Sequence, residues 1–415
     1  MKNLFKLFAM FIVFSSVAFA QEDEGEETEI KEITIIHAGT LLAVAGNDPV
    51  QEKSIIIEDG KIKSVKDGYI DNDGTEDAEF TIIDMSDKFV MAGMMDMHVH
   101  LASGSGNSAD YAIKGVINSY KTLMAGFTTV RDLGASDDTI FKLRKAINDG
   151  DVIGPRIYAA GNIIGVGGRT NGKECNGIES CRKTTRDMIR GGADWIKIYS
   201  SCSGSQLCSN EDGSPMFFDD EITAITEVAK KYNIKVAAHS HPRDSALQVL
   251  KYGVKSIEHG SFINEDAMDT MIADDVYYVP TVSVMDMLEE VVEKGEVSEE
   301  MLIHDQSFLD NNPPKIFEAY KRGVKIATGT DAGVVPHGKN YREVERFVEL
   351  GIPNSDALKM TTVNAADLLD KSDEIGTIEV GKKADIIAID GNPLETIEDI
   401  RNVVFVMKEG TVYKD

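Results

Sequence analysis

Short alternations of apolar and polar residues occupy both ends of the chain. Residues 33–36 show this pattern near the N-terminus, and residues 384–389 repeat it near the C-terminus. An alternation with a period of two is typical of antiparallel strands that bury one face. We therefore predict that residues 32–88 and 376–415 together form one small β-sandwich domain.

Between these ends, apolar runs of strand length alternate with longer amphipathic stretches of helical period. The pattern predicts strands at residues 89–100, 128–132, 156–160, 194–199, 234–239, 255–259, 276–280 and 324–331. It predicts helices between them at residues 112–125, 140–148, 184–190, 220–232, 246–252, 265–273 and 314–322. Eight such strands favour an α/β fold, a (β/α)8 TIM-type barrel over residues 89–375. A doubly wound open sheet is the alternative, but no Gly-rich dinucleotide turn follows any predicted strand.

The first twenty residues have the pattern of a secretory signal. Lys2 and Lys6 precede an apolar stretch at residues 7–14, and Ala18 and Ala20 provide small residues at a cleavage site. Residues 1–20 are therefore interpreted as a signal peptide, with a retained N-terminal anchor as the alternative. The acidic residues 21–31 are expected to be disordered. The mature protein is expected to be periplasmic or secreted.

Composition narrows the choice of partners. The chain of 415 residues carries a formal net charge of −27, which argues against nucleic acid and against anionic membranes. The composition does not determine the oligomeric state, and a homo-oligomer is possible.

Four cysteines form two closely spaced pairs, Cys175 with Cys181 and Cys202 with Cys208, and in an exported protein local disulfides are expected. The five-residue gaps differ from the short CxxC spacing of structural zinc sites.

Candidate metal ligands fall at the C-terminal ends of predicted strands, where barrel enzymes assemble their active sites. His98 and His100 share one face of a strand because side chains alternate, so both can reach one metal ion. Lys197 lies in the apolar run 194–199, where a bare ammonium would be costly unless something neutralises or uses it. The remaining candidates end later strands: His239, His259 and Asp331.

Several segments resemble motifs of the amidohydrolase superfamily. They are MAGMMDMHVHL at 91–101, GADWIKIYS at 192–200, VAAHSH at 236–241, SIEHG at 256–260 and TGTDAG at 328–333. The similarity extends from about residue 32 to the C-terminus and is strongest to the binuclear-zinc group of imidazolonepropionase-like and prolidase-like dipeptidases.

This resemblance implies a centre with two Zn²⁺ ions. His98, His100 and Asp331 would bind one ion, His239 and His259 would bind the other, and a carboxylated Lys197 would bridge them. Asp331 would act as the catalytic residue that holds the nucleophilic hydroxide and accepts its proton. Two alternatives stay open, namely an uncarboxylated Lys197 paired with an acid, as in mononuclear relatives, and Asp331 as a helix N-cap.

The resemblance also implies groups that bind the free carboxylate of a small-molecule substrate. The candidates are His241, Tyr278, Arg169 and His337. Arg169 departs from the family pattern, because many relatives have histidine in this glycine-rich segment; a solvent-exposed role is equally open.

The sequence thus predicts an exported amidohydrolase that cleaves dipeptides or N-acyl amino acids, of the type Xaa-Pro, Xaa-hydrophobic or Xaa-Arg/Lys. The alternatives are a mononuclear cyclic-amide hydrolase of the imidazolonepropionase type and a non-catalytic periplasmic peptide-binding protein. Hydrolysis of a dipeptide would distinguish the predicted amidohydrolase from a peptide-binding protein.

Overall fold

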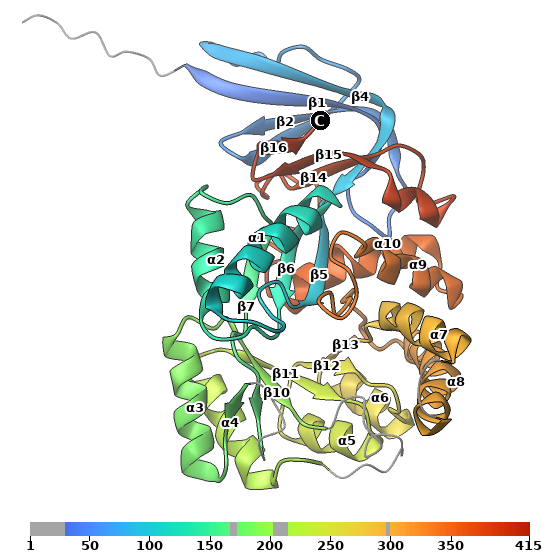
Figure 1. Cartoon of the computed structure of the whole chain (residues 1–415). Coiled ribbons are helices and arrows are strands. Elements are labelled where there is room, and N and C mark those ends of the chain that lie inside the picture. The colour runs from blue at the N-terminus through green and yellow to red at the C-terminus, as the bar shows by residue number, and fades with distance from the viewer. Residues whose placement is uncertain (1–29, 167–171, 202–214, 296–298) are drawn as a thin grey trace, which may run out of the picture.

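The computed structural model describes residues 30–166, 172–201, 215–295 and 299–415 (Figure 1). The predicted signal peptide, Arg169 and the Cys202–Cys208 pair lie outside the described residues. Across the described ranges, no helix combines the length and the apolar character needed to cross a membrane.

Both ends of the chain meet in one seven-stranded sheet, at the top of Figure 1. Its central strand β4 (Ala78–Ala92) pairs in parallel with β1 (Lys31–Leu42) and antiparallel with β14 (Ile386–Ile389). The other strands are β2 (Val50–Glu58), β3 (Lys61–Asp67), β15 (Val403–Lys408) and β16 (Thr411–Lys414).

The expected β-sandwich is therefore one continuous sheet and not two separate ones. The reason is the length of β4, which carries hydrogen bonds from the N-terminal strands to the C-terminal strands. Side chains from both halves still share one hydrophobic core, which includes Ile36, Ile55, Ala388 and Phe405. Burial of this shared core joins the two ends of the chain.

Parallel strands and helices alternate through the middle of the chain. One parallel sheet contains β5 (Met94–Val99), β6 (Phe127–Asp132) and β7 (Arg156–Ala159). The other contains β8 (Ile164–Gly165), β9 (Lys173–Glu174), β10 (Trp195–Tyr199), β11 (Lys235–Ser240), β12 (Ser256–His259) and β13 (Tyr277–Val279). The helices between them are α1 (Ser108–Met124), α2 (Thr139–Asn148), α3 (Ile178–Arg190), α4 (Asp219–Lys231), α5 (Arg243–Lys251) and α6 (Glu265–Ala273). The fold is thus mixed α/β, as predicted.

The eighth predicted strand, residues 324–331, does not form a regular strand. Its backbone instead makes isolated bridges, Ile326 with Tyr278 and the following Ala332 with Val99. Its hydrogen bonds go to β13 on one side and to β5 on the other, so the segment still lies between these two strands. These bridges connect the two parallel sheets at one place, and on the opposite side the amide of Asp194 donates to the carbonyl of Ala159 at 2.8 Å. The closed barrel itself stays a prediction.

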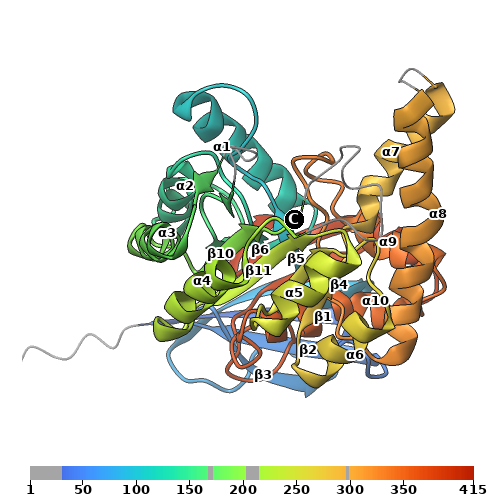
Figure 2. The same cartoon turned by 90° about the horizontal axis from the view of Figure 1, so that it is seen from below.

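A helical hairpin stands beside the C-terminal ends of the strands (Figure 2). It consists of α7 (Met285–Lys294) and α8 (Glu299–Arg322), and α8 continues through Pro313 and Pro314. The sequence predicts only residues 314–322 of this hairpin as helix, because a proline pair normally marks a helix start. Three further helices follow, α9 (Tyr341–Glu349), α10 (Asn354–Met360) and α11 (Val363–Leu368).

One predicted disulfide lies within the described residues. Cys175 and Cys181 are bonded and buried, with their Cα atoms 4.5 Å apart. Local pairing is therefore confirmed for this pair, and it closes a short loop at the start of α3.

Candidate active site

Two groups of side chains with metal-ligand chemistry meet at the C-terminal ends of the parallel strands. One group is His98, His100 and Asp331, and the other is His239, His241 and His259. Within each group the ligand atoms lie within 4.8 Å of one another. The two groups adjoin, because the rings of His98 and His259 have centroids 5.0 Å apart. The fold thus brings together five residues that sequence analysis assigned to a metal centre, and adds His241.

Unusual backbone conformations aim two of these side chains. His259 has a φ of 69° and Asp331 a φ of 57°, both in the left-handed region that costs energy for residues other than glycine. The neighbouring Gly329 is required for close approach, since a Cβ atom there would lie 2.9 Å from the Cβ atom of His98. Glycine at position 329 therefore allows the segment that carries Asp331 to pack directly against the strand that carries His98.

The Nδ1 atoms of three histidines each have a hydrogen-bond partner. His98 Nδ1 lies 2.9 Å from Glu258, His100 Nδ1 donates to the carbonyl of Gly134 at 2.7 Å, and His259 Nδ1 lies 2.8 Å from the Thr281 hydroxyl. The Nε2 atoms of His98 and His100 instead face Asp331 Oδ1, at 3.8 and 3.1 Å. Metal-bound histidines have this arrangement, in which the distal nitrogen is held by a fixed acceptor.

Lys197 is buried between the two groups, with 1% of its surface exposed. Within the described chain its Nζ atom has no hydrogen-bond partner. Its charge acts on His98 and Asp331 of one group and on His259 of the other. Burial lowers the pKa of Lys197 to about 8, although Glu258 and Asp331 oppose the shift. A buried amine that is partly neutral and has no partner fits a residue that can be carboxylated and complete a metal centre.

A buried ion pair supports His98 from behind. Arg131 and Glu258 are fully buried and lie 2.9 Å apart, and the other oxygen of Glu258 contacts His98. Burial alone would raise the pKa of Glu258, but the Arg131 guanidinium and His98 lower it to about 2. The guanidinium also lies 4.5 Å from the ring centroid of Trp195. Glu258 is therefore an ionised acceptor that fixes the orientation of His98.

A second buried network joins β5 to the segment that carries Asp331. Asp96 accepts hydrogen bonds from the Thr330 hydroxyl at 2.6 Å and from the Asn340 amide at 2.7 Å. It also accepts from the backbone amides of His98 and Thr330. Asp96 thereby sets the distance between the two strand ends that supply the first ligand group.

Sequence analysis missed Asp96, Arg131 and Glu258 as supporting residues. Each is a charged residue in a predicted strand, and Asp96 and Glu258 also stand inside motif segments. That signal could have marked them, because an ionised group in a buried strand requires a partner.

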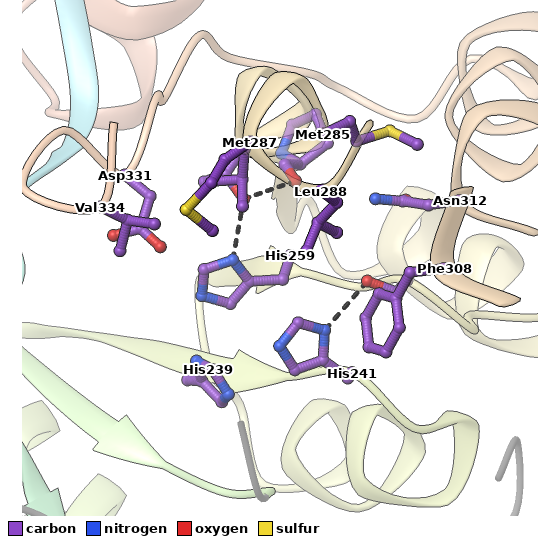
Figure 3. Close-up of a pocket in the computed structure, with 14 residues that line it drawn as sticks. His239, His241, His259, Met285, Met287, Leu288, Phe308, Asn312, Asp331 and Val334 are labelled. Carbon is purple, nitrogen blue, oxygen red and sulfur yellow. Dashed lines mark hydrogen bonds between the residues drawn. The ribbon is translucent and has the colours of Figure 1, made fainter. Parts of the chain in front are cut away.

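A cavity of about 230 Å³ opens against the second ligand group (Figure 3). His239, His241, His259 and Asp331 line one side of it. The opposite side is mostly apolar, with Asn312 as a polar residue, and comes mainly from η2 (Val282–Val284), α7 and α8. Its apolar residues are Val284, Met285, Met287, Leu288, Phe308 and Val334. A second cavity of about 430 Å³ lies beside His100, and its lining residues include Ser103, Ser105, Ser136 and Tyr199. Residues of the two ligand groups thus line two separate cavities.

The residues predicted to contact substrate are placed differently from one another. His241 lines the apolar cavity, and its Nδ1 lies 2.9 Å from the Ser261 hydroxyl. Tyr278 was expected at the substrate, but it is fully buried and its hydroxyl donates to the carbonyl of His259 at 2.9 Å. His337 lies behind His100, with Nε2 at 3.3 Å from the His100 carbonyl oxygen. Tyr278 and His337 therefore contact the ligand-bearing backbone and do not line the apolar cavity.

Solved structures share this architecture over almost the whole chain. A crystal structure of a Xaa-Pro dipeptidase with methionine bound in its active site is 36% identical and has a TM-score of 0.85, covering 92% of this chain and 100% of that one. A prolidase complexed with N-methylphosphonate-L-proline is 27% identical with a TM-score of 0.82, covering 92% and 99%.

A curated relative is similar over nearly the same length. Ochratoxinase from Aspergillus niger is 28% identical over 93% of this chain and 88% of that protein. Its crystal structure has a TM-score of 0.81 at 26% identity, covering 93% and 96%. Residues 89–413 match the amidohydrolase family as a whole. These residues contain both ligand groups and Lys197, and the chain belongs to the amidohydrolase family.

Proposed function

We propose that this protein is an exported, metal-dependent hydrolase that cleaves the amide bond of dipeptides or N-acyl amino acids on a (β/α)8 barrel. The carrying observation is the buried, unpartnered Lys197 Nζ between two groups of metal-ligand side chains. His98, His100 and Asp331 would hold one Zn²⁺, His239 and His259 the other, and carboxylated Lys197 would bridge them. Nitrogen and oxygen ligands of this kind suit zinc.

When bound, such a metal pair supplies an activated water nucleophile near neutral pH and polarises the substrate carbonyl. The chain's own residues then orient the reactants. His98 and His100 keep Nε2 directed inward because Glu258 and the Gly134 carbonyl hold their Nδ1 atoms. Although burial opposes it, the nearby His98 and His100 lower the pKa of Asp331, which keeps its carboxylate ionised. An ionised Asp331 can accept the proton of the attacking water and return it to the departing amine.

The residues that line the apolar cavity indicate which substrate side chains it can accept. Apart from Asp331, its lining within the described chain contains no acidic side chain, and Met285, Leu288 and Phe308 provide apolar contacts. Such a lining favours a proline or hydrophobic residue over arginine or lysine. The methionine and the proline analogue bound in the two similar structures have apolar side chains, which match this lining.

The first test measures metal content by elemental analysis and then amino-acid release from Gly-Met, Gly-Leu, Gly-Pro and Gly-Arg. We expect two zinc ions per chain and faster hydrolysis of the apolar substrates than of Gly-Arg. One metal ion with cyclic-amide hydrolysis and no dipeptide cleavage would instead support the imidazolonepropionase-type alternative. Binding of dipeptide without release of amino acids would support a peptide-binding protein.

A pocket variant sharpens this test. Leu288→Asp should lower kcat/KM for Gly-Leu by about 10- to 200-fold, the effect of losing one apolar contact, and should reduce the preference against Gly-Arg. Val380→Asp is the matched control, because Val380 is 69% exposed and lies outside the cavity lining. Equal substrate preferences in both variants would show that the apolar cavity does not receive the substrate side chain.

A further inference from the structure

The outer face of α1 is apolar and exposed. Ile113, Val116, Ile117 and Tyr120 are 61%, 41%, 47% and 50% exposed. Among the side chains that the structure describes, no other helix has more than one exposed large hydrophobic residue. Their spacing of three and four residues places them in one stripe, because such positions are neighbours on a helix surface. Figures 1 and 2 show α1 on the outside of the molecule.

The opposite face of α1 packs against the rest of the chain. Gly115, Ser119, Thr122 and Leu123 are buried, and a Cβ atom at Gly115 would lie 2.8 Å from Leu143 of α2. The exposed stripe is therefore additional to the packing of the monomer. Scattered exposed hydrophobic residues need no explanation, but a contiguous stripe on one helix is typical of an interaction surface.

We propose that this face, defined by Ile113, Val116, Ile117 and Tyr120, binds the same face of a second copy of the chain, with the two α1 helices antiparallel. Charges beside the stripe favour this occupant. Asp110 stands in the first turn and Lys121 in the last turn of α1. Helical geometry puts both on the same side of the stripe, about 16 Å apart along the axis.

An antiparallel pair related by a two-fold axis brings the same side of both helices together. Asp110 of one copy then meets Lys121 of the other, and the reverse contact forms at the opposite end. A centre between Val116 and Ile117 leaves the two charged positions offset by only about 3 Å along the axis. The helix dipoles of the two copies also oppose each other in this arrangement. The same face can therefore complement itself in shape, in apolar character and in charge.

An anionic membrane is a poorer occupant of this face. The net charge of −27 repels anionic lipid headgroups. The stripe is also bordered at one end by the carboxylate of Asp110, which anionic headgroups would repel. This inference does not rest on the proposed hydrolase activity, because it uses no residue of the ligand groups.

Sedimentation or light scattering of the full chain tests the interface by particle mass. We expect wild type to associate and Ile117→Glu to halve the mass of the particle while its circular dichroism spectrum stays native. Ile272→Glu is the matched control, since Ile272 is 45% exposed on α6 and lies outside the stripe. A monomeric wild type, or an Ile117→Glu particle with the mass of wild type, would overturn the proposal.

Charge reversal tests the antiparallel pairing. Asp110→Lys places two lysines opposite each other at both ends of the pair, and Lys121→Asp places two aspartates there. Each variant should therefore associate less tightly than wild type. An equal mixture of the two should form the mixed pair in preference to either self-pair, because both contacts in it join lysine to aspartate. A statistical mixture of the three pairs would contradict the antiparallel arrangement.

Discussion

Replacement of Glu258 by glutamine tests the support beneath the candidate metal centre. Glu258→Gln keeps the size of the side chain and removes its charge. The Arg131 guanidinium then remains fully buried without its counter-charge, which in the native protein lies 2.9 Å away. Breaking one side of a buried ion pair costs about 3–5 kcal/mol. For a chain of 415 residues we expect the Tm to fall by roughly 3–6 °C.

The same substitution also acts on metal binding. The carboxylate contacts His98 Nδ1 at 2.9 Å and so orients Nε2 toward Asp331. Loss of such a contact typically weakens metal affinity about 10- to 100-fold. Stability is measured by denaturant unfolding of metal-free protein, and affinity by competition with a chromogenic chelator, so the two effects are separated.

Two further variants control for general damage to the core. Glu345→Gln alters a carboxylate that is 2% exposed, but its partners Arg401 and Arg342 are 47% and 24% exposed, so we expect a loss of about 1 kcal/mol or less and no change in metal affinity. The double variant Arg131→Met with Glu258→Gln removes both charges and should regain much of the stability, but not the metal affinity. The reasoning is refuted if Glu258→Gln unfolds like wild type, or if metal affinity returns with the double variant.

Three other predictions use different parts of the structure. Asp331→Asn should reduce kcat about 100- to 10,000-fold while elemental analysis still finds metal, and a near wild-type rate would remove Asp331 from its proton-accepting role. Cys175→Ala with Cys181→Ala opens a loop of sequence separation 6 and should cost about 2 kcal/mol in urea unfolding; an unchanged midpoint would contradict this. Burial raises the pKa of Glu343 from 4.5 to about 8, so the stability that its protonated form contributes is full below pH 4.5 and is lost as pH rises through about 8. Glu343→Gln should therefore have a flatter decline of Tm between these pH values than wild type.

The positions of the ligand-bearing residues could be predicted because they depend on local patterns. The alternation along β5 puts His98 and His100 on one face, and the helices between strands follow from apolar spacing of three and four. Helix α6 was predicted with the bounds it has in the structure, since its sequence opens with two acidic residues after a capping asparagine.

The supporting contacts could not be predicted because they depend on how distant strands are placed. Arg131 and Glu258 are 127 residues apart and meet only through the arrangement of β6 and β12. Tyr278 illustrates the same limit. It was expected to contact substrate, but its hydroxyl donates to the carbonyl of His259, a residue with left-handed backbone.

The charge balance of the site gives a physical reason why the proposed carboxylation of Lys197 would be favourable. Arg131 neutralises Glu258, which leaves the Asp331 carboxylate facing the Lys197 ammonium in the protein without metal. An ammonium at this position would repel both metal ions across a buried, low-dielectric space. A carbamate on the same Nζ atom would instead place one negative charge, shared by two oxygen atoms, between the ligand groups. A pKa of about 8 leaves part of Lys197 neutral near physiological pH, and the neutral amine is the form that reacts with CO2. Burial of Lys197 thus strengthens the repulsion between its ammonium form and two metal ions. Burial also favours the neutral amine, whose reaction with CO2 would remove this repulsion.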